Sequence, residues 1–374
     1  MTCPNIPEID LGEWSDRILE QLHGQRYPLR GSLELTGRCN FNCVHCYINQ
    51  PASNLASRKK ELTTDQIQGL IDQMVDAGCL FLTITGGEPL LRPDFPEIYH
   101  YAIQKGLLIN LFTNGTLLSE SIVALLAEFP TRSVEISLYG ATGDTYEKVT
   151  RRKHAYGQVH QGIQRLIEKG IPFSLKTMVL TLNQHEFDQI RSYAEQLNVN
   201  FRYDNLIWPR LDGDLTPLSY QLPPEDLVQF DFADPKRQQE WIRLYERLEG
   251  EKIRASYVYS CGAGVRSFHI NWQGQLSACM MLQDPSYDLM AMTFQEAWER
   301  IGALRQKKRI HQTACQSCML NDLCDQCPAW AKIVHHDEEK PVELLCQIAH
   351  MRVAEIDKIK KSDRILSEEI ISYE

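Results

Sequence analysis

Three cysteines lie within eight positions of the stretch CNFNCVHCY, residues 39–47: Cys39, Cys43 and Cys46, in Cx3Cx2C spacing. Thiolates are ligands for soft metals. A structural zinc site takes four protein ligands, and here His45 is the only local candidate for the fourth. A four-iron cluster held by three thiolates would instead leave one iron without a protein ligand. The spacing therefore predicts an iron–sulfur cluster with one position open to another molecule.

A second group of cysteines lies toward the C-terminus, with a different spacing. Clustered cysteines in a chain without a secretory signal indicate metal binding rather than disulfides. Zinc would use the two CxxC units of residues 315–327, but the five-residue gap between them is short for such a site, and three cysteines stay unexplained. The group consists of Cys261, Cys279, Cys315, Cys318, Cys324, Cys327 and Cys346.

Two short motifs follow the first cysteine group. In TGGEP (85–89), the glycines allow close approach of a ligand to the backbone, Glu88 offers a carboxylate to an ammonium group, and Pro89 stiffens the turn. Taken alone, TGGEP also fits an ordinary strand-to-helix turn. The second motif is Thr113-Asn114-Gly115, which follows another apolar run.

Alternating strands and helices are predicted to position these motifs. A capping box, Thr63 with Gln66, starts a helix whose apolar residues recur on one face, and Gly78 ends it. Six strand–helix units of this kind predict a parallel sheet, in either an open doubly wound form or an incomplete barrel. The expected strands are 32–37, 79–85, 107–113, 133–139, 173–180 and 200–204, and the expected later helices are 96–105, 119–127, 158–169 and 185–197.

The remainder of the chain is less regular. Residues 209–235 are rich in proline and acids and are predicted to be a linker or lid, followed by a helix at 236–248. Residues 267–280 predict a hairpin that turns at Gln273-Gly274. Further helices are expected at 293–306 and 347–370.

The Cx3Cx2C group with Tyr47 directly after it, then TGGEP and TNG in that order, resembles the radical S-adenosylmethionine (SAM) enzymes. The resemblance covers roughly residues 30–205 and implies a partial (β/α)6 TIM-like barrel. It implies that SAM chelates the open iron, that one-electron reduction cleaves its C–S bond, and that the 5′-deoxyadenosyl radical abstracts a substrate hydrogen. The SAM-binding residues that it implies are Tyr47, Gly86, Gly87, Glu88, Pro89, Thr113, Asn114 and Ser137.

Three basic residues are further candidates for the same pocket. Arg151 or Arg152 is expected to pair with the SAM carboxylate, although a solvated surface charge explains either equally well. Lys176 interrupts an apolar strand. It either points into the mouth of the barrel or extends its ammonium group to solvent.

The seven C-terminal cysteines resemble a SPASM domain, which implies two auxiliary iron–sulfur clusters in addition to the SAM-binding [4Fe-4S] cluster. Cys315, Cys318, Cys324 and Cys346 would hold one auxiliary cluster, and Cys261, Cys279 and Cys327 the other. Only two residues separate Cys324 from Cys327, where the family usually has three. Some members of the family have an eighth cysteine shortly before the first, and residues 255–260 contain none. The second auxiliary cluster then has either a site open to substrate or an unidentified ligand such as Asp or His.

These assignments divide the chain into an N-terminal extension (1–28), a radical SAM core (29–208), a linker or lid with a bridging helix (209–250), a SPASM domain (251–350) and a C-terminal helix (351–374). The resemblance implies a maturase that modifies a ribosomally synthesised peptide by crosslinking, oxidation or excision. A small-molecule radical SAM dehydrogenase is the alternative. Sulfatase maturation is disfavoured, because Met280 stands where an aspartate is expected. A non-catalytic iron–sulfur or zinc protein is disfavoured by the intact TGGEP and TNG motifs.

Composition limits the partners. The net charge of −10 argues against non-specific nucleic-acid binding. There is no apolar run of the length that spans a membrane, and the acidic N-terminal stretch is not a secretory signal, so a cytoplasmic protein is expected. About thirty residues precede the first strand, too few for a leader-binding domain. A separate small partner protein is therefore expected to bind a precursor's leader, and an external flavodoxin- or ferredoxin-type protein to supply electrons.

Overall fold

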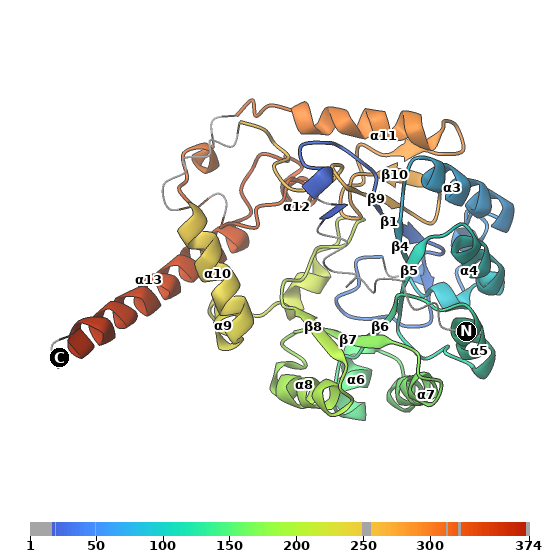
Figure 1. Cartoon of the computed structure of the whole chain (residues 1–374), viewed down its shortest axis with the longest axis horizontal. Coiled ribbons are helices and arrows are strands. Elements are labelled where there is room, and N and C mark those ends of the chain that lie inside the picture. The colour runs from blue at the N-terminus through green and yellow to red at the C-terminus, as the bar shows by residue number, and fades with distance from the viewer. Residues whose placement is uncertain are drawn as a thin grey trace, which may run out of the picture.

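The computed structural model describes residues 17–18, 20–48, 50–248, 256–311, 313–320 and 323–371. Most of the expected N-terminal extension lies outside these residues, as do the expected boundary near residue 250 and the last three residues of the expected C-terminal helix. Within the described part, helices and strands alternate around one large sheet (Figure 1).

Six parallel strands form the centre of this sheet. They are β1 (Arg30–Glu34), β4 (Phe81–Thr85), β5 (Leu108–Thr113), β6 (Ser133–Ser137), β7 (Phe173–Met178) and β8 (Asn200–Asp204). Each strand pairs with the next one along the chain, in the order β1-β4-β5-β6-β7-β8. A doubly wound sheet would reverse direction at an inner strand. The unreversed order therefore gives the partial barrel, and the six predicted units are confirmed.

Helices connect these strands and lie on the outside of the curved sheet (Figure 1). The capping box of Thr63 and Gln66 at the start of α3 is present as predicted. Gly78, Gly106 and Gly170 end helices with positive φ values of 93°, 83° and 64°, where an L side chain would be strained. The helices are α3 (Thr64–Asp76), α4 (Phe95–Gln104), α5 (Glu120–Glu128), α6 (Gly143–Thr150), α7 (Ala155–Glu168) and α8 (Phe187–Gln196).

The hydrophobic core lies between the sheet and these helices. Alternate strand residues such as Leu33, Ile84 and Leu111 are fully buried in one cluster with the apolar faces of the helices. Their neighbours in sequence face the inside of the barrel, and many of these are polar: Ser32, Glu34, Thr83, Asn110, Glu135 and Lys176. The inner face of the sheet is therefore a polar surface.

The cysteine-rich region extends the same sheet. The predicted hairpin is present as β9 (Ser267–Ile270) and β10 (Gln275–Ser277), with β11 (Tyr287–Asp288) beside it. Strand β9 pairs with β1 in parallel, so the sheet order becomes β11-β10-β9-β1 at this edge. The C-terminal region is thus joined directly to the first strand of the barrel.

The remaining elements flank the barrel. Residues 209–235 contain a helix, α9 (Pro224–Ala233), which the prediction of a linker or lid did not include. It buries Leu227 and Val228 and packs against α10 (Pro235–Leu248) and α13 (Glu343–Ile371). The other elements are β2 (Arg38–Cys39), β3 (Gln50–Pro51), α2 (Leu55–Arg58), α11 (Phe294–Gly302) and α12 (Pro328–His335).

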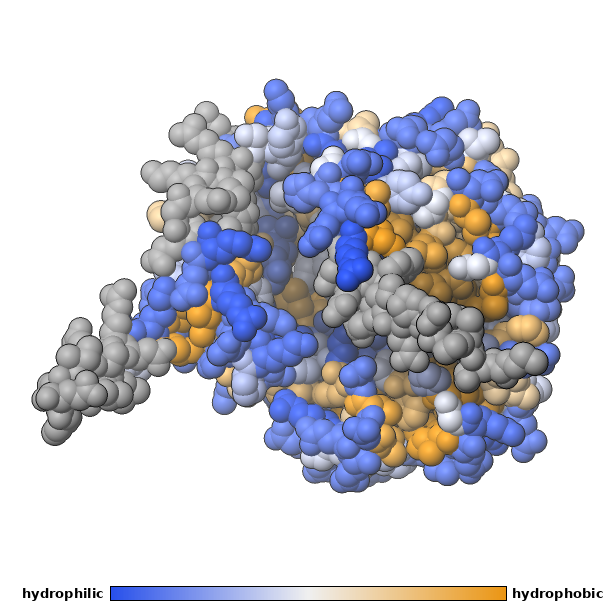
Figure 2. Space-filling model, in the orientation of Figure 1, coloured by the Kyte–Doolittle hydropathy of each residue, from blue (hydrophilic) through white to orange (hydrophobic). Residues whose placement is uncertain are grey.

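The distribution of polar and apolar residues on the surface reflects the arrangement of the helices around the sheet. Polar and charged residues cover the outer helices, and apolar residues gather nearer the middle of the face shown in Figure 2. Within the described part of the chain, the helices are too short or too polar to cross a bilayer.

Candidate active site

The first cysteine group lies in the loop between β2 and β3. Cys39 is the last residue of β2, and Cys43 and Cys46 follow in irregular backbone. Two backbone hydrogen bonds hold this loop against the end of α6: Asn42 N–H donates to the Thr150 carbonyl at 3.0 Å, and Val44 N–H donates to the Val149 carbonyl at 3.0 Å. The barrel therefore fixes the loop, although the loop has almost no regular structure of its own.

The three thiols of this loop interact with one another. Burial raises the pKa of Cys39 to about 12, and Cys46 adds to that shift. Burial raises the pKa of Cys43 as well, and the thiols of Cys46 and Cys39 contribute. Such thiols are protonated at neutral pH, and they become thiolates when a metal supplies positive charge. Three neighbouring, partly buried thiols therefore fit an iron–sulfur cluster.

Asn114 of the TNG motif connects this loop to the end of β5. Its amide nitrogen donates to Asn40 Oδ1 at 2.8 Å and lies 3.9 Å from the Cys39 sulfur. Asn40 in turn donates to Thr116 Oγ1 at 2.9 Å. The TNG loop and the cysteine loop are therefore neighbours, as the order of the motifs predicted.

Glu88 of TGGEP is fully buried, with 0% of its surface exposed. Its carboxylate accepts hydrogen bonds from Thr113 Oγ1 (2.8 Å), Asn114 N–H (2.8 Å) and Leu90 N–H (3.1 Å). Burial raises its pKa to about 7 against the effect of these bonds. The side chain joins TGGEP to TNG, and its predicted contact with the SAM ammonium group stays a prediction.

We expect Glu88→Gln to destabilise the protein by roughly 1–3 kcal/mol, because either orientation of the amide turns an NH2 group toward an N–H or O–H donor in a buried site. Urea unfolding of the anaerobic protein measures this loss. Glu97→Gln is the matched control, since Glu97 is exposed and accepts a hydrogen bond from Gln68, and its expected effect is within about 0.5 kcal/mol. Equal stability of the two variants would contradict the assigned role.

The glycines of TGGEP face protein backbone. A Cβ atom at Gly86 would lie 2.3 Å from the Thr36 carbonyl oxygen, and one at Gly87 would lie 2.2 Å from the Arg38 carbonyl oxygen. Gly87 N–H also donates to the Thr36 carbonyl at 2.7 Å. The absence of side chains thus lets TGGEP pack on the segment that leads into the cysteine loop. The approach of a ligand to these glycines stays a prediction.

Ser137 and Lys176, two of the predicted SAM-binding residues, contact protein side chains in the structure. Ser137 ends β6 and hydrogen-bonds the Tyr139 side chain. Lys176 extends along the inner face of the sheet, 3.0 Å from Glu135 and 3.6 Å from the Phe112 ring centre.

Arg151 is exposed and donates to the Tyr220 hydroxyl at 3.3 Å. Arg152 is exposed as well. Arg151 directly follows Thr150, the residue that holds the cysteine loop, so it lies at the rim of the site. Pairing of either arginine with the SAM carboxylate stays a prediction.

His45 lies between two of the cysteines. Its ring packs edge-on against Tyr139, with 4.7 Å between the ring centres. Burial lowers its pKa to about 4, so the imidazole is neutral. Its Nδ1 atom has no hydrogen-bond partner among the described residues.

The C-terminal cysteines form two interacting sets. Burial raises the pKa of Cys327, and the thiols of Cys279 and Cys261 contribute to this shift. Burial likewise raises the pKa of Cys324, with contributions from Cys346 and Cys315. Cys315 interacts in turn with Cys318 and Cys346. These contributions place Cys261, Cys279 and Cys327 near one another, and likewise Cys315, Cys318, Cys324 and Cys346; the assignment of each set to a cluster stays a prediction.

The set of Cys261, Cys279 and Cys327 lies beside a buried tyrosine. Tyr259 is buried and interacts with both Cys327 and Cys279, and its hydroxyl donates to Glu338 Oε2 at 2.7 Å. Trp330, in the first turn of α12, donates its backbone N–H to Cys327. Among the described residues, no three His, Cys, Asp or Glu side chains are arranged around a single-ion site.

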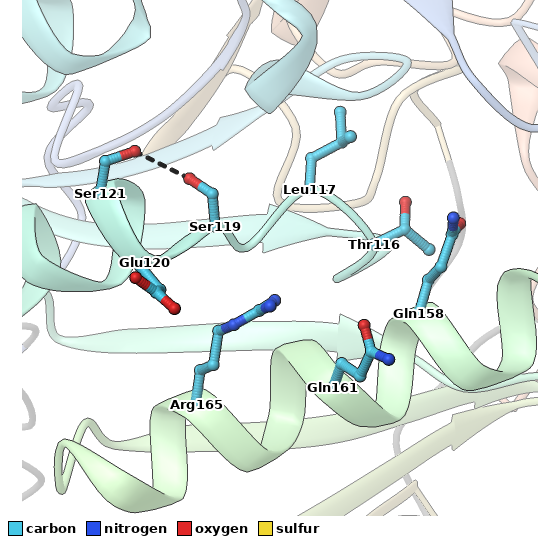
Figure 3. Close-up of a pocket in the computed structure, with 8 residues that line it drawn as sticks. All are labelled: Thr116, Leu117, Ser119, Glu120, Ser121, Gln158, Gln161 and Arg165. Atoms are coloured by element: carbon cyan, nitrogen blue, oxygen red, sulfur yellow. Dashed lines mark hydrogen bonds between the residues drawn. The ribbon is translucent and has the colours of Figure 1, made fainter.

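A surface pocket lies outside this site (Figure 3). The loop after β5 lines one side of it, and side chains of α7 such as Gln161 and Arg165 project toward that loop. Thr116, on its edge, is the partner of Asn40. None of the predicted SAM-binding residues lines this pocket.

Two sets of contacts near the cysteine loop were not predicted from the sequence. Glu34 hydrogen-bonds the Tyr47 side chain, and His269 lies 3.6 Å from Glu34. A turn around Arg210 also covers the cysteine loop, where Leu211 N–H donates to the Tyr47 carbonyl at 3.1 Å. The first set could have been suspected from the sequence, because Glu34 is a charged residue within the otherwise apolar strand SLELTG.

Comparisons with known proteins agree with this geometry. The model of the radical SAM superfamily matches residues 33–194. The AdoMet-dependent heme synthase of Methanosarcina barkeri is 28% identical over 330 residues, 82% of this chain and 94% of that protein. The mycofactocin maturase MftC of Mycobacterium ulcerans is 26% identical over 318 residues, 82% of this chain and 85% of that protein.

Among solved structures, Streptococcus suis SuiB bound to S-adenosylmethionine superposes with a TM-score of 0.63 at 15% identity, over 91% of this chain and 84% of that one. The same protein bound to its precursor peptide SuiA gives a TM-score of 0.63 at 16% identity, over 88% and 80%. The likeness thus extends through the cysteine-rich region. Residues 33–194 form a radical SAM domain, and the chain shares the fold of SuiB over 91% of its length.

Proposed function

We propose that this protein reductively cleaves S-adenosylmethionine and modifies a ribosomally synthesised peptide. The observation that carries the proposal is the connection of the three-cysteine loop to both downstream motifs: Asn114 contacts Cys39 and Asn40, and Glu88 accepts the Asn114 backbone N–H. A bound cluster and SAM supply one-electron cleavage of a C–S bond. The chain's own residues hold the cysteine loop at the carboxyl ends of the strands, where parallel α/β proteins bind ligands.

Two auxiliary clusters complete the proposed cofactor content. The interacting sets Cys315, Cys318, Cys324, Cys346 and Cys261, Cys279, Cys327 support it. Three four-iron clusters amount to about twelve irons per chain. An external one-electron donor and a reducing compartment, the cytoplasm, follow from this chemistry.

Replacing Cys261, Cys279 and Cys327 together with Ala is expected to lower the iron content of the reconstituted protein by about four per chain, because one whole cluster loses its ligands. Anaerobic iron and sulfide analysis measures the change. Cys79→Ala is the matched control, since Cys79 is a buried core residue whose thiol contacts backbone at Phe81 and Gly31 and belongs to neither cysteine group. Unchanged iron in the triple variant would contradict the assignment.

Relatives support a peptide substrate. SuiB is recorded with a bound precursor peptide, and a mycofactocin maturase covers most of this chain. The polar inner face of the barrel offers both charges to a peptide, with Lys176 and Arg202 around Glu135. The modification is a crosslink, an oxidation or an excision.

A small-molecule oxidation is the second candidate, because a heme synthase is the relative with 28% identity over 82% of the chain. Sulfatase maturation has less support. The residue after Cys279 is Met280, and a thioether is too weak an acceptor to serve as a base.

Mass spectrometry separates the candidates. The reconstituted protein is incubated under reductant with peptides encoded by neighbouring small open reading frames, and separately with iron coproporphyrin. A mass change in a peptide together with deoxyadenosine release supports the proposal. Release with the porphyrin alone would replace it with the second candidate.

A further inference from the structure

A glutamate and a histidine face each other inside the barrel. Glu34 is the last residue of β1, and His269 lies on β9, which pairs with β1 at Ser32. The two side chains are 3% and 2% exposed, and His269 Nε2 lies 3.6 Å from Glu34 Oε1. The pair therefore bridges the barrel and the cysteine-rich region.

The two facing atoms lack any other partner. Among the residues described, Glu34 Oε1 and His269 Nε2 have no hydrogen bond, while His269 Nδ1 lies 3.2 Å from Ser32 Oγ. A carboxylate oxygen is an acceptor, and so is Nε2 of an imidazole whose proton is on Nδ1. Two buried acceptors face to face are unfavourable, and one proton between them satisfies both.

Burial favours this protonated arrangement. It raises the pKa of Glu34 to about 8 and lowers the pKa of His269 to about 4, so a neutral acid faces a neutral imidazole. Among the described residues, the titratable side chains that contact Glu34 are His269 and Tyr47, and Tyr47 itself interacts with Cys46 and Tyr139.

The other contacts of Glu34 lead to the predicted SAM site. Its carboxyl group hydrogen-bonds the side chain of Tyr47, which directly follows Cys46, and the backbone N–H of Trp272. Trp272 lies in the turn of the β9–β10 hairpin, and its indole packs on Gly37 at the start of the cysteine loop. Glu34 thus holds both the end of that loop and the hairpin.

We propose that Glu34 and His269 share one proton and act as a positioning pair that fixes Tyr47 beside the SAM site. The expected effect of the pair on SAM binding rests on the proposed function. The shared proton is inferred from the contact between Glu34 and His269 and does not depend on that function. The pair is buried and acts through Tyr47.

The test uses the anaerobic, fully reconstituted protein and measures the dissociation constant of S-adenosylmethionine. Glu34→Gln keeps a donor toward His269 and an acceptor toward Tyr47, so its affinity at pH 7 is expected to stay within about threefold of wild type. Glu34→Ala leaves these groups unpaired, and we expect roughly tenfold weaker binding. Equal weakening by Gln and Ala, or by neither, overturns the proposal.

A double-mutant cycle tests whether the pair acts through Tyr47. Glu34→Ala and Tyr47→Phe remove opposite ends of one hydrogen bond, so the double variant is expected to bind no more weakly than the weaker single variant. If the losses in SAM-binding free energy of the two single variants added up in the double variant, Glu34 would affect SAM binding independently of Tyr47. Iron content equal to wild type in every variant confirms that the clusters are retained.

The shared proton has its own readouts. Wild-type affinity is expected to fall as pH rises through about 8, where Glu34 loses the proton, whereas Glu34→Gln is expected to stay flat. Infrared spectroscopy is expected to show a protonated-carboxyl band at pH 7 that Glu34→Gln lacks. Because Glu88 also has a raised pKa, the comparison is a difference spectrum of wild type minus Glu34→Gln, in which the Glu88 band cancels. If the Glu34 band is present in this difference but wild type never binds SAM, the proposed function fails and the shared proton stands. If the difference spectrum contains no protonated-carboxyl band, the shared proton itself is refuted.

Discussion

Cys43→Ala is expected to abolish SAM cleavage and to lower the iron content by about four per chain. Cys43 is the middle ligand of the proposed first cluster, and its thiol interacts with those of both Cys39 and Cys46. A cluster reduced to two protein ligands is not held in this loop, and the chemistry belongs to the cluster. Deoxyadenosine formed under dithionite, measured by chromatography, is expected to fall to the level without enzyme.

Cys79→Ala is the control for the loss of a buried cysteine. Cys79 is 5% exposed and lies in the main core, next to β4. Its replacement removes one sulfur atom from the core and is expected to cost about 1 kcal/mol while iron and activity are retained. Deoxyadenosine release by Cys43→Ala at the rate of Cys79→Ala would rule out the first cluster as assigned.

Gly87→Ala is expected to destabilise the protein by more than about 4 kcal/mol or to prevent folding. The new Cβ would lie 2.2 Å from the Arg38 carbonyl oxygen and 2.5 Å from its carbon, both of which are backbone atoms. Neither side has room to move, because Gly87 N–H donates to the Thr36 carbonyl at 2.7 Å and Glu88 N–H donates to the Arg38 carbonyl at 2.8 Å. The yield of folded protein and its urea unfolding measure the effect.

Gly69→Ala is the matched control for the added methyl group. Gly69 lies within α3, and a Cβ atom there would meet nothing within 4 Å. Alanine is the better helix former, so we expect this variant to be more stable by about 0.5–1 kcal/mol. If the Gly87→Ala protein were stable and retained its iron, TGGEP would not pack on the backbone of Thr36 and Arg38 as described.

Local patterns were sufficient to predict most of the barrel. The capping box at Thr63 and the apolar face from Ile67 to Met74 are properties of adjacent residues, and both appear in α3. Apolar runs such as 107–113 became strands buried against helices. Helix α9 was missed, because Pro223 and Pro224 and the acids after them hide a helix start in a segment of weak periodicity.

Contacts between distant segments had no local signal. The pairing of β9 with β1 joins residues more than two hundred positions apart, and it creates the Glu34–His269 pair. The close packing of the TGGEP glycines on the backbone of Thr36 and Arg38 is a contact that no local pattern specified. The sorting of the C-terminal cysteines came from family resemblance, because spacing alone permits several groupings.

The most direct test of the central claim is the electron paramagnetic resonance spectrum of the reduced first cluster, recorded before and after addition of S-adenosylmethionine. The seven C-terminal ligand cysteines are replaced by alanine, so that only the cluster of Cys39, Cys43 and Cys46 contributes. An iron that lacks a protein ligand binds SAM, and the spectrum is expected to change. A spectrum that SAM leaves unchanged, from a protein with about four irons per chain, would show that a side chain such as His45 occupies that position.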